Sequence, residues 1–120
     1  MTLLRKARGK IGENETAKEL IRQGYRILVR NYSCRVGEID LIAEKKGTLV
    51  FVEVKSKTTS LFGLPQESVT FRKQEKIRKV AQIYLMQTKQ YNRQISFCVI
   101  AVQLDKQGRL LTVELIENAF

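Results

Sequence analysis

Residues 38–55 decide the fold, and in one-letter code they read EIDLIAEKKGTLVFVEVK. Two mainly apolar runs, Glu38–Ala43 and Leu49–Lys55, flank the polar segment Glu44–Gly47. Apolar, β-branched runs separated by a short polar turn that contains glycine are typical of a β-hairpin. The stretch therefore predicts two adjacent antiparallel strands.

The chain before this hairpin predicts a helix followed by a strand. Between about residues 12 and 23, Ala17, Leu20 and Ile21 recur on one helical stripe. Residues 25–31 are rich in aromatic and β-branched side chains. We therefore expect the first strand there.

The chain after the hairpin predicts a loop at residues 58–66, a helix at about 68–88 and strands at 95–103 and 110–116. The apolar stripe of this second helix comprises Ile77, Val80, Ala81, Tyr84 and Leu85. The continuous apolar run at 95–103 is expected for a strand covered on both faces. The order α-β-β-β-α-β-β has no repeat or internal linker. It predicts a single α/β domain over residues 1–120, in which helices flank a mixed sheet.

The chain is strongly basic, with 22 Lys and Arg against 12 Asp and Glu and a formal net charge of +10. Such a surplus favours a polyanionic partner, because basic side chains neutralise phosphates and release counterions. We therefore expect nucleic acid, and DNA first, as the partner. A basic protein with merely solvated charged faces is the alternative that the charge leaves open.

Histidine is absent, which excludes Ser-His-Asp triads, Cys-His pairs and histidine-ligated zinc. Acid–base chemistry must then come from Asp, Glu, Lys, Tyr or Cys. A metal site would be rich in oxygen ligands, which suit Mg²⁺ or Mn²⁺.

The two cysteines, Cys34 and Cys98, are far apart and form no CxxC motif. Cys98 lies in an apolar run and is expected to be buried and reduced, although the sequence leaves a disulfide open. Residues 1–5 lack the apolar region of a signal peptide, and no run approaches transmembrane length. We therefore expect a cytoplasmic protein with no membrane contact.

Asp40, Glu53 and Lys55 form the candidate site. Side chains alternate along a strand, so Phe51, Glu53 and Lys55 share a face that begins apolar and ends with an acid and a base. A hairpin turning near Lys46 pairs positions whose numbers sum to about 92 or 93. This register sets Asp40 opposite Glu53 or within one residue of it. Two carboxylates and a lysine can therefore converge on one point.

This set suits phosphodiester hydrolysis with a divalent metal. The carboxylates of Asp40 and Glu53 supply hard oxygen ligands, and the backbone carbonyl of Val54 is the expected third. The metal would stabilise charge on the phosphate and acidify an attacking water. Lys55 would orient that water or stabilise the transition state as a fixed positive charge. Two adjacent carboxylates repel each other without a cation, and a metal resolves that conflict.

Each of these residues also has a simpler explanation. Asp-x₁₂-Glu-x-Lys is a loose spacing, and Glu53 with Lys55 could be an exposed ion pair worth under about 1 kcal/mol. Glu13 lies four residues before Ala17 on the apolar stripe, where a carboxylate needs a partner such as a metal or Lys55. The helix macrodipole would also explain Glu13. Lys73 lies on the second helix's stripe and either points at the phosphate or extends to water.

Six short blocks stand out along the chain. They are Gly12–Glu13, Gly37–Ile42, Phe51–Lys55, Phe62–Gly63, Lys73–Gln74 and the closing Asn118–Phe120. Together they resemble the signature blocks of the YraN family (uncharacterised protein family UPF0102). The resemblance covers nearly the whole chain, and the pair GEIDLI and FVEVK is its specific part. Thr16 stands where the family usually has Ala, a small change.

The YraN family is similar in turn to archaeal Holliday-junction resolvases and to the restriction-endonuclease-like superfamily. The resemblance implies an α-β-β-β-α-β core, metal ligands at Asp40 and Glu53, and a catalytic Lys55. It also implies that Glu13 is a helix-borne acid in the same site. Because resolvase relatives act as two-fold dimers on branched DNA, a homodimer is expected by analogy.

Two functional hypotheses follow. The first is a Mg²⁺- or Mn²⁺-dependent endonuclease that hydrolyses DNA phosphodiester bonds, on branched or damaged structures. The second is a non-catalytic nucleic-acid-binding module that retains the fold. In both, two basic clusters are expected to contact phosphates, unless they are only solvated faces. The clusters are Arg5, Lys6, Arg8 and Lys10 near the N-terminus, and Arg72, Lys73, Lys76 and Lys79 on the second helix.

Overall fold

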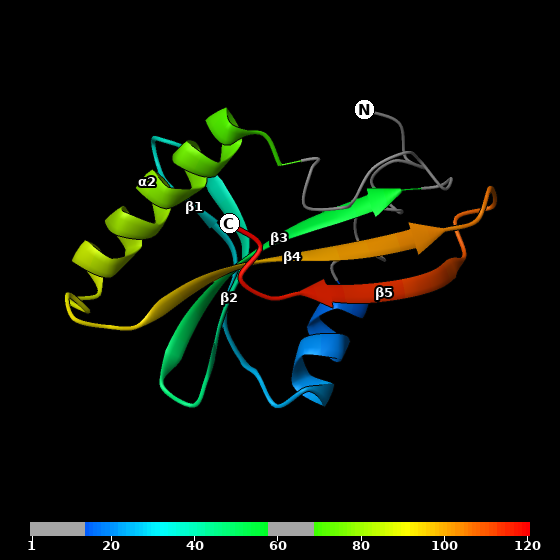
Figure 1. The fold of residues 1–120 in the computed structure, drawn as a ribbon, viewed down its shortest axis with the longest axis horizontal. Coiled ribbons are helices and arrows are strands. Elements are labelled where there is room, and N and C mark those ends of the chain that lie inside the picture. Colours follow the sequence, from blue (N-terminus) through cyan, green and yellow to red (C-terminus); the bar gives the residue numbers. More distant parts are fainter. Residues whose placement is uncertain (1–13, 58–68) are drawn as a thin grey trace.

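The structure, a computed structural model, describes residues 14–57 and 69–120 (Figure 1). Its centre is a five-stranded sheet in the order β1-β2-β3-β4-β5, in which only β3 and β4 are parallel. The strands are β1 (Arg26–Ser33), β2 (Glu38–Lys45), β3 (Thr48–Lys57), β4 (Ile95–Leu104) and β5 (Leu110–Ile116), and helix α2 spans Phe71–Gln87. A first helix at residues 14–22 precedes them. The predicted α/β class, mixed sheet and element order are confirmed.

The sheet carries a helix and an apolar core on each face (Figure 1). Helix α2 packs on one face, and the first helix packs on the other. Alternate residues of β3 divide between the two cores. Leu49 and Phe51 pack with α2, whereas Val50 and Val52 pack with the first helix. This division is expected of a strand that is covered on both faces.

The first helix corrects one part of its predicted stripe. Ala17 and Leu20 are buried as expected, but Ile21 is 58% exposed. Thr16 is fully buried instead, and its hydroxyl has no hydrogen-bond partner among the described residues. The buried face of this helix therefore includes Thr16 and excludes Ile21, unlike the face that the apolar residues predict.

The hairpin of β2 and β3 has the predicted register. Leu41 lies opposite Val52, and the numbers of all paired residues sum to 93. Lys46 and Gly47 form the turn, with φ angles of 50° and 82°. Two successive positive φ angles characterise a type I′ turn, whose twist matches that of the flanking strands.

Strand β4 and helix α2 match their predicted burial. Cys98 on β4 is 1% exposed and both cysteines are free, so there is no disulfide between them. The buried residues of α2 are Ile77, Val80, Ala81 and Tyr84. The helix begins later than predicted, because Thr70 serves as its N-cap and accepts a hydrogen bond from the Lys73 N–H at 3.2 Å. Within the described residues, no helix is long and apolar enough to cross a membrane.

Candidate functional site

The candidate site begins where β2 and β3 stop pairing. Their last paired residues at this end are Leu41 and Val52, although β3 continues beside β4 as far as Lys57. Beyond that pair, the backbone N–H of Val54 donates to Oδ2 of Asp40 at 2.7 Å. The carboxylate thus takes the role of a backbone carbonyl at this edge of β3. The bond holds Asp40 against β3, next to Glu53.

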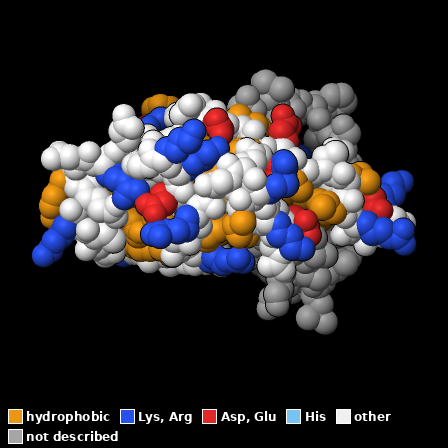
Figure 2. Space-filling view, turned by 90° about the horizontal axis from the view of Figure 1, so that it is seen from below, with side chains coloured by type: hydrophobic (Ala, Val, Ile, Leu, Met, Phe, Trp, Pro, Cys, Tyr) orange, Lys and Arg blue, Asp and Glu red, His pale blue; other side chains and the backbone are white. Residues whose placement is uncertain are grey.

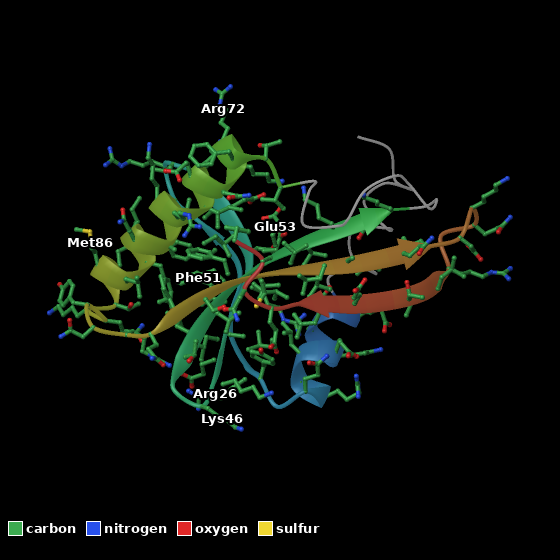
Figure 3. The ribbon with its side chains drawn as sticks, viewed as in Figure 1. Arg26, Lys46, Phe51, Glu53, Arg72 and Met86 are labelled. Atoms are coloured by element: carbon green, nitrogen blue, oxygen red, sulfur yellow. The ribbon has the colours of Figure 1, made fainter. Side chains whose placement is uncertain are left out.

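Glu53 lies between β3 and α2, within the layer that separates strand from helix (Figure 3). Its Oε1 lies 3.0 Å from Nζ of Lys73 on α2 and 3.9 Å from Nζ of Lys55 on β3. The Glu53 side chain is only 12% exposed. The simpler explanation, an exposed ion pair between Glu53 and Lys55 alone, is therefore wrong. Glu53 is shared by two lysines and largely shielded from water.

The two lysines respond differently to this environment. Burial, together with the neighbouring ammonium of Lys73, lowers the pKa of Lys55 despite the attraction of Glu53 and Asp40. Burial also lowers the pKa of Lys73, but its contacts with Lys55 and Glu53 outweigh that effect, so the pKa is raised overall. Lys73 has the closer carboxylate contact and therefore carries the firmer positive charge.

A hollow of about 210 Å³, called here the α2 hollow, opens beside these side chains. Its lining residues are Gly37, Glu38, Asp40, Glu53, Lys73, Lys76 and Ile77. The sheet side supplies carboxylates and the helix side supplies ammonium groups. The hollow can therefore hold both a cation and an anion at close range.

Gly37 makes room for the helix above it. A Cβ atom at Gly37 would lie 3.1 Å from Cε of Lys76 and 3.5 Å from Val80. Any other residue there would force Lys76 to shift. This role of Gly37 was not predicted from the sequence. The sign of it in the sequence is a glycine immediately before the strand that starts at Glu38.

The start of α2 attracts anions. Its first turn holds no acidic residue, while Arg72 and Lys73 lie in that turn. A helix N-terminus already carries partial positive charge, so basic residues there weaken the helix slightly and strengthen the field toward an anion. Residues that lower the stability of their own helix in this way are typical of functional positions.

The predicted site residues fall into three groups. Those brought together around the α2 hollow are Asp40, Glu53, Lys55, Lys73 and Lys76. Two exposed residues of α2, Arg72 and Lys79, do not line it, and Figure 3 shows Arg72 pointing away from the sheet. The predicted residues that lie outside the described part of the chain are Glu13, Arg5, Lys6, Arg8 and Lys10.

The donor set fits a hard divalent cation. Asp40 and Glu53 offer oxygen ligands only, and Mg²⁺ is commonly bound through one or two carboxylates with water completing its shell. Residues 14–57 and 69–120 hold no group of three or more His, Cys, Asp or Glu side chains placed to bind a metal. The Lys73 ammonium lies beside Glu53 on the other side of the hollow from Asp40's strand. Asp40 and Glu53 are thus two carboxylates that line the α2 hollow together.

Comparison with known proteins finds one family. The model of the uncharacterised protein family UPF0102 matches residues 12–102. A "UPF0102 protein" of Moorella thermoacetica is 46% identical over 120 residues, which is 100% of both chains. A "UPF0102 protein" of Desulforamulus reducens is 45% identical over 122 residues and 99% of both chains. These relatives match along their whole length.

Among solved structures, the chain is similar to Pyrococcus furiosus SfsA in complex with Ca²⁺. The sequence identity is 16% and the TM-score is 0.38. The alignment covers 94% of this chain and 62% of that one. Family membership therefore rests on the sequence relatives.

Proposed function

Starting from the fact that the chain belongs to the uncharacterised protein family UPF0102, we propose that it is a divalent-metal-dependent endonuclease. Its substrate is DNA, whose phosphodiester bonds it hydrolyses. One observation carries the proposal: Asp40 and Glu53, from adjacent strands, line one hollow with Lys73 and Lys76. Such a site needs carboxylates that bind the cation and ammonium groups that bind the phosphate.

Asp40 and Glu53 would hold Mg²⁺ or Mn²⁺, with the Val54 carbonyl as a further ligand. When bound, such an ion stabilises charge on the phosphate and acidifies water. Asp40 is held in place for this role by the Val54 N–H. Lys55, beside Glu53, keeps a positive charge at the reacting phosphate or orients the water. Glu13 joins these residues by family resemblance.

Lys73 and Lys76 act on the nucleic-acid side of the proposal. Lys73 now pairs with Glu53 at 3.0 Å. If Glu53 held a metal, the Lys73 ammonium would be the group placed to bind a phosphate oxygen. Lys76 borders the same hollow from the next turn of α2. These contacts position the DNA backbone and carry no sequence preference.

The wider surface supports a polyanionic substrate. Figure 2 shows Lys and Arg side chains across one face, with acidic groups dispersed among them. The formal net charge of +10 drives binding by counterion release, so affinity falls steeply with salt. Arg72 and Lys79 on α2, and Arg5, Lys6, Arg8 and Lys10 near the N-terminus, are the remaining proposed phosphate contacts.

The direct test is cleavage of a DNA panel with Mg²⁺ or Mn²⁺. The panel comprises linear, nicked, flapped and four-way-junction DNA. We expect the purified protein to cut at least one substrate, and Lys55→Ala to abolish cutting while leaving binding largely intact. Lys18→Ala is the matched control, because Lys18 is a 74% exposed lysine on the first helix, away from the hollow. Cutting that survives unchanged in Lys55→Ala would come from a contaminating nuclease or from a reaction that does not use Lys55, and either result would contradict the proposal.

A non-catalytic nucleic-acid-binding module is the second candidate. It is favoured by the ion pair of Glu53 with Lys73, which satisfies the carboxylate without a metal. This function predicts DNA binding on the same panel with no product under either metal. The two candidates therefore differ in one readout, the appearance of cut DNA.

A further inference from the structure

A second pocket lies on the other face of the sheet, at the hairpin end. It encloses about 320 Å³ and is called here the hairpin pocket. Its lining residues are Tyr25, Lys45, Lys46, Thr48, Val50, Ser96, Cys98, Glu117 and Asn118. None of them lines the α2 hollow. In Figure 3, Lys46 marks the hairpin tip, well away from Glu53.

The floor of the hairpin pocket comes from two adjacent parallel strands. Val50 of β3 lies beside Ser96 of β4, and side chains two residues apart share a face. Thr48, Val50, Ser96 and Cys98 therefore project to the same side of the sheet. Val50 and Cys98 are almost fully buried, while Thr48 and Ser96 are partly exposed. The floor thus combines an apolar centre with two hydroxyl groups.

Two hydrogen bonds connect the walls of the hairpin pocket. The hydroxyl of Tyr25, just before β1, donates to Oε1 of Glu117, just after β5, at 3.0 Å. The Ser96 hydroxyl donates to Oδ1 of Asn118 at 2.8 Å. Burial, followed by the bond to Glu117, raises the pKa of Tyr25 to about 12, so its hydroxyl remains a donor at neutral pH. Because these polar groups are already fixed, binding a ligand costs less conformational entropy.

Positive charge stands at the rim. The ammonium of Lys45 lies over the Tyr25 ring, 5.0 Å from its centroid, which directs the side chain toward the pocket. Lys46 follows at the turn with a φ of 50°. Among the described residues, no carboxylate forms an ion pair with either lysine. Lys45 and Lys46 therefore line the pocket together with a single carboxylate, that of Glu117.

We propose that the hairpin pocket binds a nucleoside phosphate, either a free mononucleotide or the phosphorylated end of a nucleic-acid strand. The volume lies at the lower end of small-molecule sites, roughly 300–1,000 Å³. Lys45 and Lys46 contact the phosphate. The apolar floor receives the base, and Glu117 accepts from a ribose hydroxyl or an exocyclic amine. The site is separate from the α2 hollow and does not depend on cleavage.

Amide NMR of the isotopically labelled protein tests this site. Five probes are titrated: adenosine 5′-monophosphate, adenosine, inorganic phosphate, and a short oligonucleotide in two forms, with and without a 5′-phosphate. We expect the monophosphate to shift the amides of Thr48, Val50, Ser96 and Asn118, and adenosine to bind much more weakly. If only the 5′-phosphorylated oligonucleotide shifts them, the strand end is the ligand and the proposed phosphate chemistry holds.

The variant for this experiment is the double change Lys45→Gln with Lys46→Gln. Loss of two charge-assisted contacts should raise the Kd at least about tenfold. Lys89→Gln is the control, because Lys89 is an exposed lysine with a similar left-handed φ of 57° at the end of α2. The spectra themselves report that each variant is folded.

Three results would overturn the proposal. One is the absence of shifts at these amides with every phosphate-bearing probe. Another is a set of shifts confined to Gly37, Asp40, Glu53 and Lys73, which would assign the nucleotide to the α2 hollow. The third is an unchanged Kd in the double variant. Failure of DNA cleavage would leave this proposal standing, because the titration needs neither metal nor turnover.

Discussion

Strand β3 presents two different halves to helix α2. In its first half, Leu49 and Phe51 are completely buried in the apolar core. In its second half, Glu53 and Lys55 occupy the same face but carry opposite charges and keep partial contact with water. The change falls where β2 stops pairing with β3. The first half of β3 thus belongs to the apolar core, and the second half belongs to the candidate site. Substitutions in the two halves should therefore have separable effects.

The largest expected effect on stability is that of Phe51→Ala. Phe51 stacks on Phe97 with ring centroids 5.6 Å apart and meets Tyr84 edge-on at 6.0 Å. Removing the ring leaves a cavity, and we expect the free energy of unfolding to fall by about 3–5 kcal/mol. Urea denaturation followed by circular dichroism measures it. A loss below about 1 kcal/mol would mean that this half of β3 does not anchor the core.

Glu53→Gln should affect DNA cleavage far more than stability. The amide keeps the shape of the side chain but removes the charge that pairs with Lys73 and Lys55. We expect DNA cleavage to be lost while the free energy of unfolding falls by much less than in Phe51→Ala, because the amide keeps the packing and Lys73 can extend to water. Cleavage assays and urea melts on the same preparation check both parts. Unaltered cleavage would exclude Glu53 from the reaction.

Lys73→Gln should change the proton affinity of Lys55. The pKa of Lys55 is lowered by burial and then by the Lys73 ammonium, so removal of that charge should raise it. In the wild type, a folded pKa below the unfolded value means that the unfolded chain binds more protons. The Lys55 contribution to stability therefore rises as pH increases between those two values. Carbon-detected NMR titration of the lysine Cε signals follows the change, with Lys18 as the internal reference.

The smallest expected effect lies at the hairpin turn. Lys46 has a positive φ of 50° before Gly47, and a lysine there is strained relative to asparagine. Lys46→Asn creates the Asn-Gly pair that type I′ turns favour, and should stabilise the protein by up to about 1 kcal/mol. A thermal melt checks the gain.

Much of this arrangement was predictable from residues 38–55. Strand alternation placed Phe51, Glu53 and Lys55 on one face. A hairpin turning near Lys46, with pair sums of 92 or 93, placed Asp40 opposite Glu53 or within one residue of it, and the structure has the sum of 93. The sequence could not predict that Lys73 rather than Lys55 makes the closer contact with Glu53. That contact depends on how α2 lies across the sheet, which is a matter of tertiary packing.

Two further features also depended on packing. Ile21 was expected inside and is 58% exposed, whereas Thr16 is fully buried. The hairpin pocket was not anticipated, since its walls come from segments 92 residues apart joined by Tyr25 and Glu117. Local periodicity predicts which face of an element is apolar. It carries little information on which distant loops close over that face.

Mn²⁺ titration followed by amide NMR tests the central claim most directly. Mn²⁺ is paramagnetic and broadens the signals of nearby amides. We predict selective broadening at Asp40, Leu41, Glu53 and Val54, which is lost in Glu53→Gln and retained in Lys18→Ala. Absence of broadening there, or broadening that persists unchanged in Glu53→Gln, would contradict a metal site at the charged end of β3.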